Sequence, residues 1–253
     1  MSTGTPPEVP TRSPLLIAIS GPSGAGKTTL TRHLQAIFSP PPPPRLHQDD
    51  FYVDEEKVPI SPESGLRDWD SPEAMDWDRF VHALREMKRA GRVVGVDSFE
   101  DLVEFDKGGG GVEGAVVEGC KGKVAKELGG GEGLAFVEGF LMFVDERVME
   151  ALDVKIFLRC RRDVARLRRE GRSVYADIEG YWKDPPGYWD KIVWPDYVKT
   201  HKRLFVNGNV EGELDEEVIS SQGIHSPGID WSMSEILSWA VDLIIVEMKK
   251  RKQ

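Results

Sequence analysis

The chain has 253 residues, of which 43 are acidic and 33 are lysine or arginine, so its formal net charge is -10. This charge repels phosphate backbones and anionic lipids, which excludes general nucleic-acid coating and binding to a membrane surface. No apolar run approaches the ~20 residues of a membrane span, the polar residues 1–13 lack a signal-peptide pattern, and two separated cysteines form neither a disulfide framework nor a zinc site. We therefore expect a cytoplasmic protein, which could also enter the nucleus.

Apolar runs typical of strands alternate with helical periodicity along the chain. Residues 15–20 form a nearly continuous apolar run, as in a strand buried on both faces. Helix-forming sequence begins near Lys27, and the five prolines over 40–44 end it and form a stiff connector. The same patterns then predict strands over 45–48, 93–96, 134–137 and 154–158, a helix over 76–90, and a last helix over about 234–250 capped by Ser232 or Ser234. Strands that alternate with helices indicate an α/β fold with a mostly parallel central sheet flanked by helices.

One segment has a different composition. Residues 103–133 contain two glycine runs, 108–111 and 129–131, and few aromatic side chains. We interpret this segment as a flexible insertion, in which 112–124 could form a short hairpin, and assign no chemistry to it. The predicted organisation is a disordered tail over 1–13 and a single domain over 14–253.

A glycine-rich motif follows the first predicted strand. Residues 21–28 match G-x-x-x-x-G-K-[ST] at every specified position. The glycines let backbone N–H groups converge on phosphate oxygens, and the N-terminus of the following helix favours an anion. Lys27 can reach the β- and γ-phosphates, while the Thr28 hydroxyl can ligate Mg²⁺. The motif predicts a P-loop NTPase fold that binds ATP with Mg²⁺. The predicted ATP site comprises Gly21, Pro22, Ser23, Gly24, Ala25, Gly26, Lys27, Thr28 and Thr29.

The rest of the chain favours a small-molecule kinase over other P-loop classes. A GTPase would carry an Asn-Lys-x-Asp guanine-reading motif, which is absent, and motors usually need partner domains that this length does not provide. A kinase needs a base near the acceptor, an acceptor pocket, and positive charge around the transferred phosphoryl group. The sequence offers candidates for each.

The positive charge is concentrated directly after the predicted strand 154–158. Seven arginines lie within residues 159–172. Guanidinium groups match phosphate oxygens bidentately, so this segment is predicted to be a phosphate-binding lid. For any single arginine, the alternative is a solvated helix face paired with acidic residues.

Carboxylates follow two of the predicted strands. Asp49 and Asp50 follow strand 45–48, and Glu138 follows strand 134–137. Ligands of open α/β sheets bind at the carboxyl edge of the strands, so either aspartate could orient the attacking hydroxyl or ligate Mg²⁺. The alternative for each carboxylate is a cap or turn residue.

Four sequence blocks together carry a family resemblance. They are residues 47–52 (HQDDFY), 69–70 (WD), 138–143 (EGFLMF) and 184–190 (DPPGYWD). The blocks resemble the nicotinamide riboside kinases, particularly the fungal forms, within the wider uridine-kinase-like group. The resemblance covers most of 15–205 outside the proline run and the glycine-rich segment. It implies transfer of the ATP γ-phosphate to the 5′-hydroxyl of nicotinamide riboside, which gives nicotinamide mononucleotide in NAD salvage.

The resemblance also implies residue roles. Asp49 would be the catalytic base near Mg²⁺, Trp69 would stack on the cationic pyridine ring, and Asp70 would bind the ribose hydroxyls. The implied catalytic residues are Asp49, Lys27 and Arg168, and the lid arginines on ATP are Arg168 and Arg172. The implied substrate residues are Asp49, Asp50, Phe51, Tyr52, Trp69, Asp70, Arg169 and Tyr175. The implied metal ligands are Thr28, Asp49 and Glu138.

Some positions depart from the family pattern. The segment from 172 to 184 is longer than in the vertebrate forms, so Tyr175 and Tyr181 compete for the second stacking role. Trp69 replaces the usual tyrosine, and residues 228–232 match the adenine-side loop poorly. Three tryptophans are interpreted as packing anchors of the lid-side loop: Trp182, Trp189 and Trp194.

The predicted partners are ATP and a small nucleoside, with neither nucleic acid nor a membrane, and we expect a monomer. Two alternatives stay open at this point. One is a uridine or other ribonucleoside kinase of the same fold, and the other is a P-loop ATPase or regulatory switch without an acceptor substrate.

Overall fold

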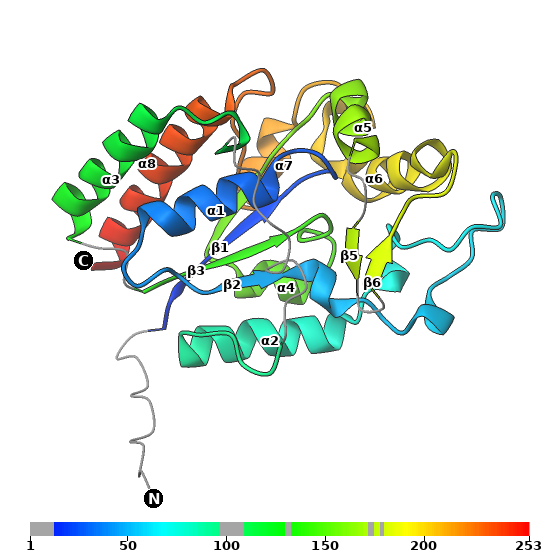
Figure 1. Ribbon diagram of the computed structural model, residues 1–253, viewed down its shortest axis with the longest axis horizontal. Coiled ribbons are helices and arrows are strands. Elements are labelled where there is room, and N and C mark those ends of the chain that lie inside the picture. Colours follow the sequence, from blue (N-terminus) through cyan, green and yellow to red (C-terminus); the bar gives the residue numbers. More distant parts are fainter. Residues whose placement is uncertain (1–12, 97–108, 130–132, 172–174, 178–179, 253) are drawn as a thin grey trace, which may run out of the picture.

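The computed structural model describes residues 13–96, 109–129, 133–171, 175–177 and 180–252 (Figure 1). Only the backbone is described for residues 175–177 and 180–182. The tail expected over 1–13 lies outside the described residues except for Ser13, as does Arg172 of the predicted lid.

The centre of the molecule is a five-stranded parallel sheet in the order β2-β3-β1-β4-β7. Its strands are β1 (Leu15–Ser20), β2 (Arg45–His47), β3 (Leu134–Gly139), β4 (Val154–Phe157) and β7 (Ile224–His225). The central pair keeps one register from Leu15 beside Leu134 to Ser20 beside Gly139. Every residue of β1 and β3 is buried, as the continuous apolar runs predicted. The α/β fold with a parallel sheet is therefore confirmed.

The strand predicted over 93–96 is wrong. These residues form no strand, although Val93 and Val96 still pack against the core. Gly95 adopts a φ of +67°, which is incompatible with a regular extended strand. β7 was not predicted, because two residues carry too little periodicity to be recognised.

Helices cover both faces of the sheet (Figure 1). One face carries α1 (Lys27–Ile37), α3 (Gly114–Leu128) and α8 (Met233–Lys252), which share an apolar cluster with Ile17 and Phe136. The opposite face carries α2 (Trp77–Ala90) and α4 (Glu146–Ala151), which pack against a second cluster. Among the described residues, no helix is long and apolar enough to cross a membrane.

The glycine-rich segment contains a helix, which corrects both the flexible insertion and the hairpin over 112–124. α3 spans fifteen residues and buries Cys120 and Val124 in the cluster shared with α1 and α8. The backbone N–H of Glu113 donates to Ser234 Oγ at 3.1 Å, which ties the start of α3 to the start of α8. The glycines suggested flexibility, but the valines and Cys120 supply an apolar side that packing stabilises. Residues 103–108 and 130–132 of the segment lie outside the described residues.

Side chains cap the starts of two helices. Asp76, whose capping role was not predicted, accepts the backbone N–H of Arg79 at 3.0 Å and begins α2. Ser232 and Glu235 exchange hydrogen bonds before α8, with Ser232 N–H to the Glu235 carboxylate at 2.7 Å and Glu235 N–H to Ser232 Oγ at 3.3 Å. This reciprocal pair is a capping box, so Ser232 is the cap.

The remaining elements lie beyond the carboxyl edge of the sheet or beside it. They are α5 (Arg162–Glu170), the antiparallel strands β5 (Tyr175–Asp177) and β6 (Gly180–Trp182), a π-helical turn (Trp189–Val193), α6 (Trp194–His201) and α7 (Glu216–Ser221). Within the described ranges there are also six short 3₁₀ turns: Gln48–Phe51, Glu55–Lys57, Pro72–Ala74, Gly109–Gly111, Lys202–Leu204 and Val206–Gly208.

Candidate active site

The predicted site residues converge at the carboxyl edge of the parallel sheet. The phosphate loop follows β1, Asp49 follows β2, Glu138 lies near the end of β3, and α5 follows β4. Because these strands are parallel neighbours, their ends meet at one edge. The structure therefore brings the loop, the proposed base and the arginine-rich helix together, as the sheet-edge rule predicts.

The phosphate loop curls around the lysine of its motif. Lys27 Nζ donates to the carbonyls of Gly21 and Pro22, both at 3.0 Å, and α1 begins at Lys27 itself. Gly24 has a φ of +83°, and a Cβ placed there would lie 2.7 Å from the Ala165 carbonyl oxygen. Glycine at this position therefore lets the loop and α5 approach each other. The result is a backbone cradle at a helix N-terminus, which suits a phosphate.

One arginine of α5 reaches this cradle. Arg168 is exposed, and its Nη1 donates to the Gly24 carbonyl at 3.0 Å. Arg161, Arg162 and Arg166 instead form exposed ion pairs with acidic side chains, including Asp230 and Asp190. The arginine-rich segment thus divides into one residue at the phosphate loop, several on the paired surface that was the alternative interpretation, and the buried Arg169 described below.

A buried pair lies behind the phosphate loop. The Glu138 carboxylate contacts His47 Nδ1 at 2.8 Å and accepts a hydrogen bond from Thr31 Oγ1 at 3.2 Å. Burial acts to raise the pKa of Glu138, but the hydrogen bond and charge of His47 outweigh it and lower this pKa. Burial acts to lower the pKa of His47, but Glu138 raises it overall. The pair therefore favours an ionised Glu138, and its role as a metal ligand stays a prediction.

The turn after β2 presents one carboxylate outward and its neighbours inward. Gln48 Oε1 accepts the Leu141 N–H at 2.8 Å, and a Cβ at Gly139 would lie 2.4 Å from that same oxygen. Glycine at 139 thus allows the turn to lock onto the end of β3. Asp49 is exposed, whereas Asp50 is buried. Of the two aspartates, Asp49 is therefore the one that solvent and small molecules can reach.

Two further predicted substrate residues follow Asp49 and Asp50. Phe51 is fully buried, with its ring centroid 5.0 Å from that of Phe80, so it lies in the core rather than on an accessible wall. Tyr52 is half-buried and meets Trp69 edge to face, with centroids 5.2 Å apart. Tyr52 thus supports Trp69, the ring that would stack on a base.

The predicted ribose residue belongs to a buried charge cluster. Arg169 Nη1 and Nη2 donate to the two carboxylate oxygens of Asp70 at 3.0 and 3.3 Å. Arg169 Nε and Nη2 also donate to Asp184 at 2.7 and 3.1 Å. Burial raises the pKa of Asp70 although Arg169 acts to lower it. Two predicted substrate residues are therefore joined, and Asp184 completes the cluster.

Asp184 and Tyr188 were missed as individual site residues. Both lie in the block 184–190, which sequence analysis used only for its resemblance. Tyr188 is buried, its hydroxyl accepts the backbone N–H of Trp69 at 3.1 Å, and Arg169 lies over its ring at 5.7 Å from the centroid. The acidic and aromatic residues of that block were the available signal. Local pattern could not show that Tyr188 meets Trp69, because the two residues are 119 positions apart.

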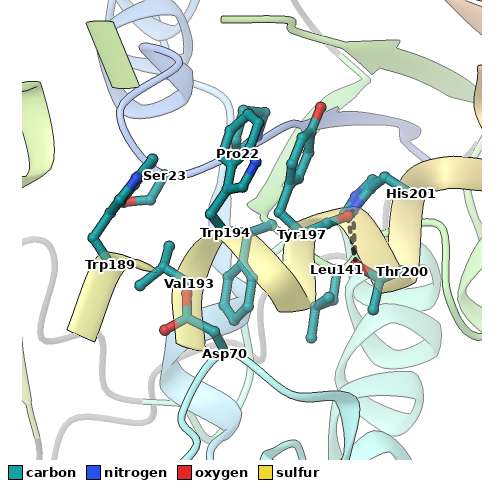
Figure 2. A pocket seen from close by; sticks show the side chains of 11 residues that line it. Pro22, Ser23, Asp70, Leu141, Trp189, Val193, Trp194, Tyr197, Thr200 and His201 are labelled. Atoms are coloured by element: carbon teal, nitrogen blue, oxygen red, sulfur yellow. Dashed lines mark hydrogen bonds between the residues drawn. The ribbon is translucent and has the colours of Figure 1, made fainter. Parts of the chain in front are cut away.

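The phosphate and ribose residues meet around one cavity (Figure 2). Pro22 and Ser23 of the phosphate loop line it together with Asp70, and Trp189 and Trp194 contribute from the segment around α6. The two tryptophans are buried and stack at 5.7 Å between centroids, so their prediction as packing anchors is confirmed. The side chains of Trp182, Tyr175 and Tyr181 lie outside the described set.

The carboxylates present fit a magnesium ion held mainly by a nucleotide. Within the described part of the chain, no group of three or more His, Cys, Asp or Glu side chains could hold a metal by itself. Mg²⁺ commonly uses one or two carboxylates together with substrate phosphates and water. The exposed Asp49 and the Thr28 hydroxyl at the end of the loop fit such a sparse set.

Several known proteins resemble this chain over most of its length. Residues 16–176 match the model of the "Phosphoribulokinase / Uridine kinase family". The chain is 32% identical to a nicotinamide riboside kinase of Schizosaccharomyces pombe, over 93% of this chain and 98% of the relative. It is 30% identical to a nicotinamide riboside kinase of Saccharomyces cerevisiae, over 91% of this chain and 95% of the relative. A uridine kinase of Leuconostoc citreum is 27% identical over 83% of this chain and 94% of the relative.

Proposed function

The chain belongs to the phosphoribulokinase/uridine kinase family and, within it, to the nicotinamide riboside kinases, and from this we propose that it transfers the γ-phosphate of ATP to the 5′-hydroxyl of nicotinamide riboside. The product is nicotinamide mononucleotide, so the reaction belongs to NAD salvage. The observation that carries this proposal is the meeting of the phosphate loop with Asp70 around one cavity.

The phosphate half of the site binds the triphosphate and neutralises its charge. The backbone of residues 21–28 cradles the phosphates at the start of α1, where the helix dipole favours an anion. Lys27 exchanges its carbonyl partners for phosphate oxygens, and Arg168 lies one hydrogen bond away from the loop. Thr28, Asp49 and Glu138 are the residues that would hold Mg²⁺, which would supply further positive charge to the phosphates. Catalysis is then mainly positioning and charge stabilisation.

Asp49 handles the acceptor proton. As the 5′-oxygen bonds to the γ-phosphorus, the bond from that phosphorus to the β–γ bridging oxygen breaks, and ADP leaves. The proton of the hydroxyl passes to the Asp49 carboxylate. The exposure of Asp49 at the carboxyl edge of β2 supports this role, because a base must reach the acceptor from the open side of the site.

The riboside half recognises a cationic ring attached to a ribose. Trp69 offers a half-buried aromatic face, which attracts a pyridinium ring by cation–π interaction and stacking. Asp70 accepts the ribose hydroxyl hydrogens, and the bidentate contact from Arg169 fixes the orientation of its carboxylate. Arg169 can in turn donate to a ribose oxygen.

A second candidate is a uridine kinase, which the similarity to the Leuconostoc citreum enzyme favours. Uridine shares the ribose but lacks the positive charge, so it would use Asp70 without the cation–π contribution of Trp69. A phosphate-loop ATPase without an acceptor would leave Trp69 and Asp70 without a role.

The test is the identity and stoichiometry of the product. Purified protein is incubated with MgATP and nicotinamide riboside, and mass spectrometry and ³¹P NMR follow the products. We expect one nicotinamide mononucleotide for each ADP, and no reaction with the 5′-deoxy riboside. ADP formation that does not depend on the riboside would contradict the proposal.

A further inference from the structure

Three buried side chains behind the phosphate loop each have one polar atom without a hydrogen-bond partner among the described residues. The atoms are Ser20 Oγ, Gln48 Nε2 and His201 Nε2. Each of these residues is at most 1% exposed. An unpaired polar atom in the interior is costly, so such atoms are normally satisfied by the protein, by a ligand or by a bound water. Three of them in one place therefore indicate a binding site.

The register of the sheet brings the three side chains together. Ser20, the last residue of β1, lies beside Gly139 of β3 and beside Phe157 of β4. The Gln48 side chain covers Gly139, since a Cβ there would lie 2.5 Å from Gln48 Cβ. The His201 ring is stacked on the Phe157 ring, with 5.5 Å between the centroids. Ser20 therefore lies between Gln48 on one side and His201 on the other.

The three side chains also share one face of the sheet. Side chains alternate between the faces along a strand. Ala18 of β1 and Val137 of β3 belong to the apolar cluster that contains Phe157. Ser20 follows Ala18 by two positions and Gly139 follows Val137 by two, so both point to the face of Phe157.

The other ring nitrogen of His201 is already bound. Nδ1 lies 2.8 Å from Thr200 Oγ1 and 3.2 Å from the Tyr197 carbonyl oxygen. The single hydroxyl hydrogen of Thr200 is donated to the Asp196 carbonyl at 2.6 Å, so we assign the ring proton of His201 to Nδ1. Burial lowers the pKa of His201 to about 4, although the backbone of Tyr197 and Phe140 acts to raise it, and the ring is neutral. Nε2 is therefore an acceptor.

The amide of Gln48 is oriented by a similar contact. Its Oε1 accepts the backbone N–H of Leu141 at 2.8 Å, which leaves Nε2 as a donor. Leu141 and His201 line the same cavity as Pro22 of the phosphate loop (Figure 2). The site thus offers a donor at Gln48, an acceptor at His201 and the hydroxyl of Ser20, which can be either.

We propose that Ser20, Gln48 and His201 bind one water molecule behind the phosphate loop, and that through it they act as positioning residues for this loop and for Asp49. The water accepts from Gln48 Nε2, donates to His201 Nε2 and uses a further position for Ser20 Oγ. It then makes about three hydrogen bonds, as buried waters usually do. The N–H groups of Gln48 disfavour a cation in this place, and the lone pair of His201 disfavours an anion.

The water joins two segments that take part in phosphoryl transfer. Ser20 directly precedes Gly21, the first residue of the phosphate loop, and Gln48 directly precedes Asp49. A bridge between Ser20 and Gln48 fixes the base relative to the phosphates, and His201 ties the bridge to α6. This inference rests on the proposed function, because it takes Asp49 as the base. A small misplacement of a reacting group lowers turnover even when both substrates still bind.

A crystal structure of the full chain tests the water directly. We expect an ordered water within about 2.6–3.2 Å of Ser20 Oγ, Gln48 Nε2 and His201 Nε2. We also expect the same water in crystals with and without nucleotide, because the three side chains are buried. Direct hydrogen bonds among the three side chains, or from them to other protein groups with no water between, would overturn the site.

Steady-state kinetics test the positioning role. His201→Phe keeps a ring against Phe157 but has no nitrogen, and we expect its kcat to fall about ten-fold, the contribution of one hydrogen bond, with both KM values unchanged. His201→Gln places an amide near the position of Nε2 and should recover most of this loss. Ser20→Ala is a smaller change that should lower kcat by a similar factor, which covers the case of His201→Phe failing to fold. His82→Phe, at an exposed position of α2, is the matched control and should keep the kcat of wild type.

Three kinetic results would overturn the positioning role. They are wild-type kcat in both His201→Phe and Ser20→Ala, a rise of the KM values without a fall in kcat, and a His201→Gln variant no more active than His201→Phe. Each of these leaves the proposed function standing, since wild type still phosphorylates nicotinamide riboside. If wild type does not phosphorylate it, the proposed function fails instead, and the crystal structure still decides whether the water is bound.

Discussion

Arg168 and Arg169 are consecutive residues of α5, yet they serve two regions of different construction. Arg168 is exposed and donates to the phosphate loop, whereas Arg169 is buried between Asp70 and Asp184. Apart from Arg168, the phosphate region comes from one continuous segment, the loop and the start of α1. The riboside region comes from the turn at 68–71, α5, the block 184–190 and α6.

This difference has energetic consequences. A contiguous loop with exposed charges can lose one side chain and keep its fold, because water replaces the lost contact. A buried cluster of two carboxylates and one guanidinium cannot, because removing one partner leaves unpaired charge in the interior. We therefore expect substitutions in the phosphate region to alter turnover, and substitutions in the riboside region to alter stability and riboside binding together.

The largest expected effect is at Asp49, between the two regions. Asp49→Ala should lower kcat by about 10²–10⁴-fold, the usual contribution of a general base, while both KM values stay close to wild type. Steady-state kinetics with each substrate varied measures this. Asp54→Ala is a matched control, since Asp54 is an exposed carboxylate close by in the chain. Retained turnover in Asp49→Ala would remove it as the base.

Arg169→Ala tests the buried cluster. Loss of the guanidinium leaves Asp70 and Asp184 without their shared partner, so the free energy of unfolding should fall by about 3–5 kcal/mol. Urea denaturation measures this change. Arg161→Ala, which removes an exposed pair with Asp230, should leave the transition unchanged. Equal stability of the two variants would show that burial does not distinguish the regions.

Arg168→Ala tests the phosphate region. Arg168 is exposed, and its partners among the described residues are the Gly24 carbonyl and, weakly, Cys160, so the variant should unfold like wild type. Removal of one preorganised cation should still lower kcat by about 10²-fold. A variant that loses stability without losing turnover would reverse the comparison between the two arginines.

The smallest of these effects is expected at Trp69. Trp69→Ala should raise the riboside KM about 10-fold, since a partly desolvated cation–π contact contributes up to ~2 kcal/mol, and should leave the ATP KM unchanged. Trp69→Tyr, which keeps an aromatic face, should restore most of the affinity. An equal rise of both KM values would refute stacking by Trp69.

The two regions also differ in how far the sequence revealed them. The strand, glycine-rich loop and helix over 15–37 follow from local patterns, and the structure has each of them in its predicted place. The helix α3 did not follow from local pattern, because its glycines lower helix propensity. Its packing against α8 compensates for that low propensity. The strand predicted over 93–96 failed because Gly95 adopts a positive φ, which the run of valines around it does not disclose.

Long-range contacts limited the rest of the site. Trp69, Asp70 and Arg169 were recognised one at a time through resemblance, but their joining through Asp184 and Tyr188 spans up to 119 positions. A motif shows chemistry that is carried by residues adjacent in the sequence. A buried network joins residues that are far apart in the sequence, so recognising it requires the fold.

The most direct test of the central claim is a competition between nicotinamide riboside and uridine at equal concentration, with limiting labelled MgATP. The ratio of the two nucleotide products gives the ratio of kcat/KM. A site built on Trp69 and Asp70 for a cationic base predicts a clear excess of nicotinamide mononucleotide over uridine monophosphate, and an excess that shrinks in Trp69→Ala. An excess of uridine monophosphate would contradict the account.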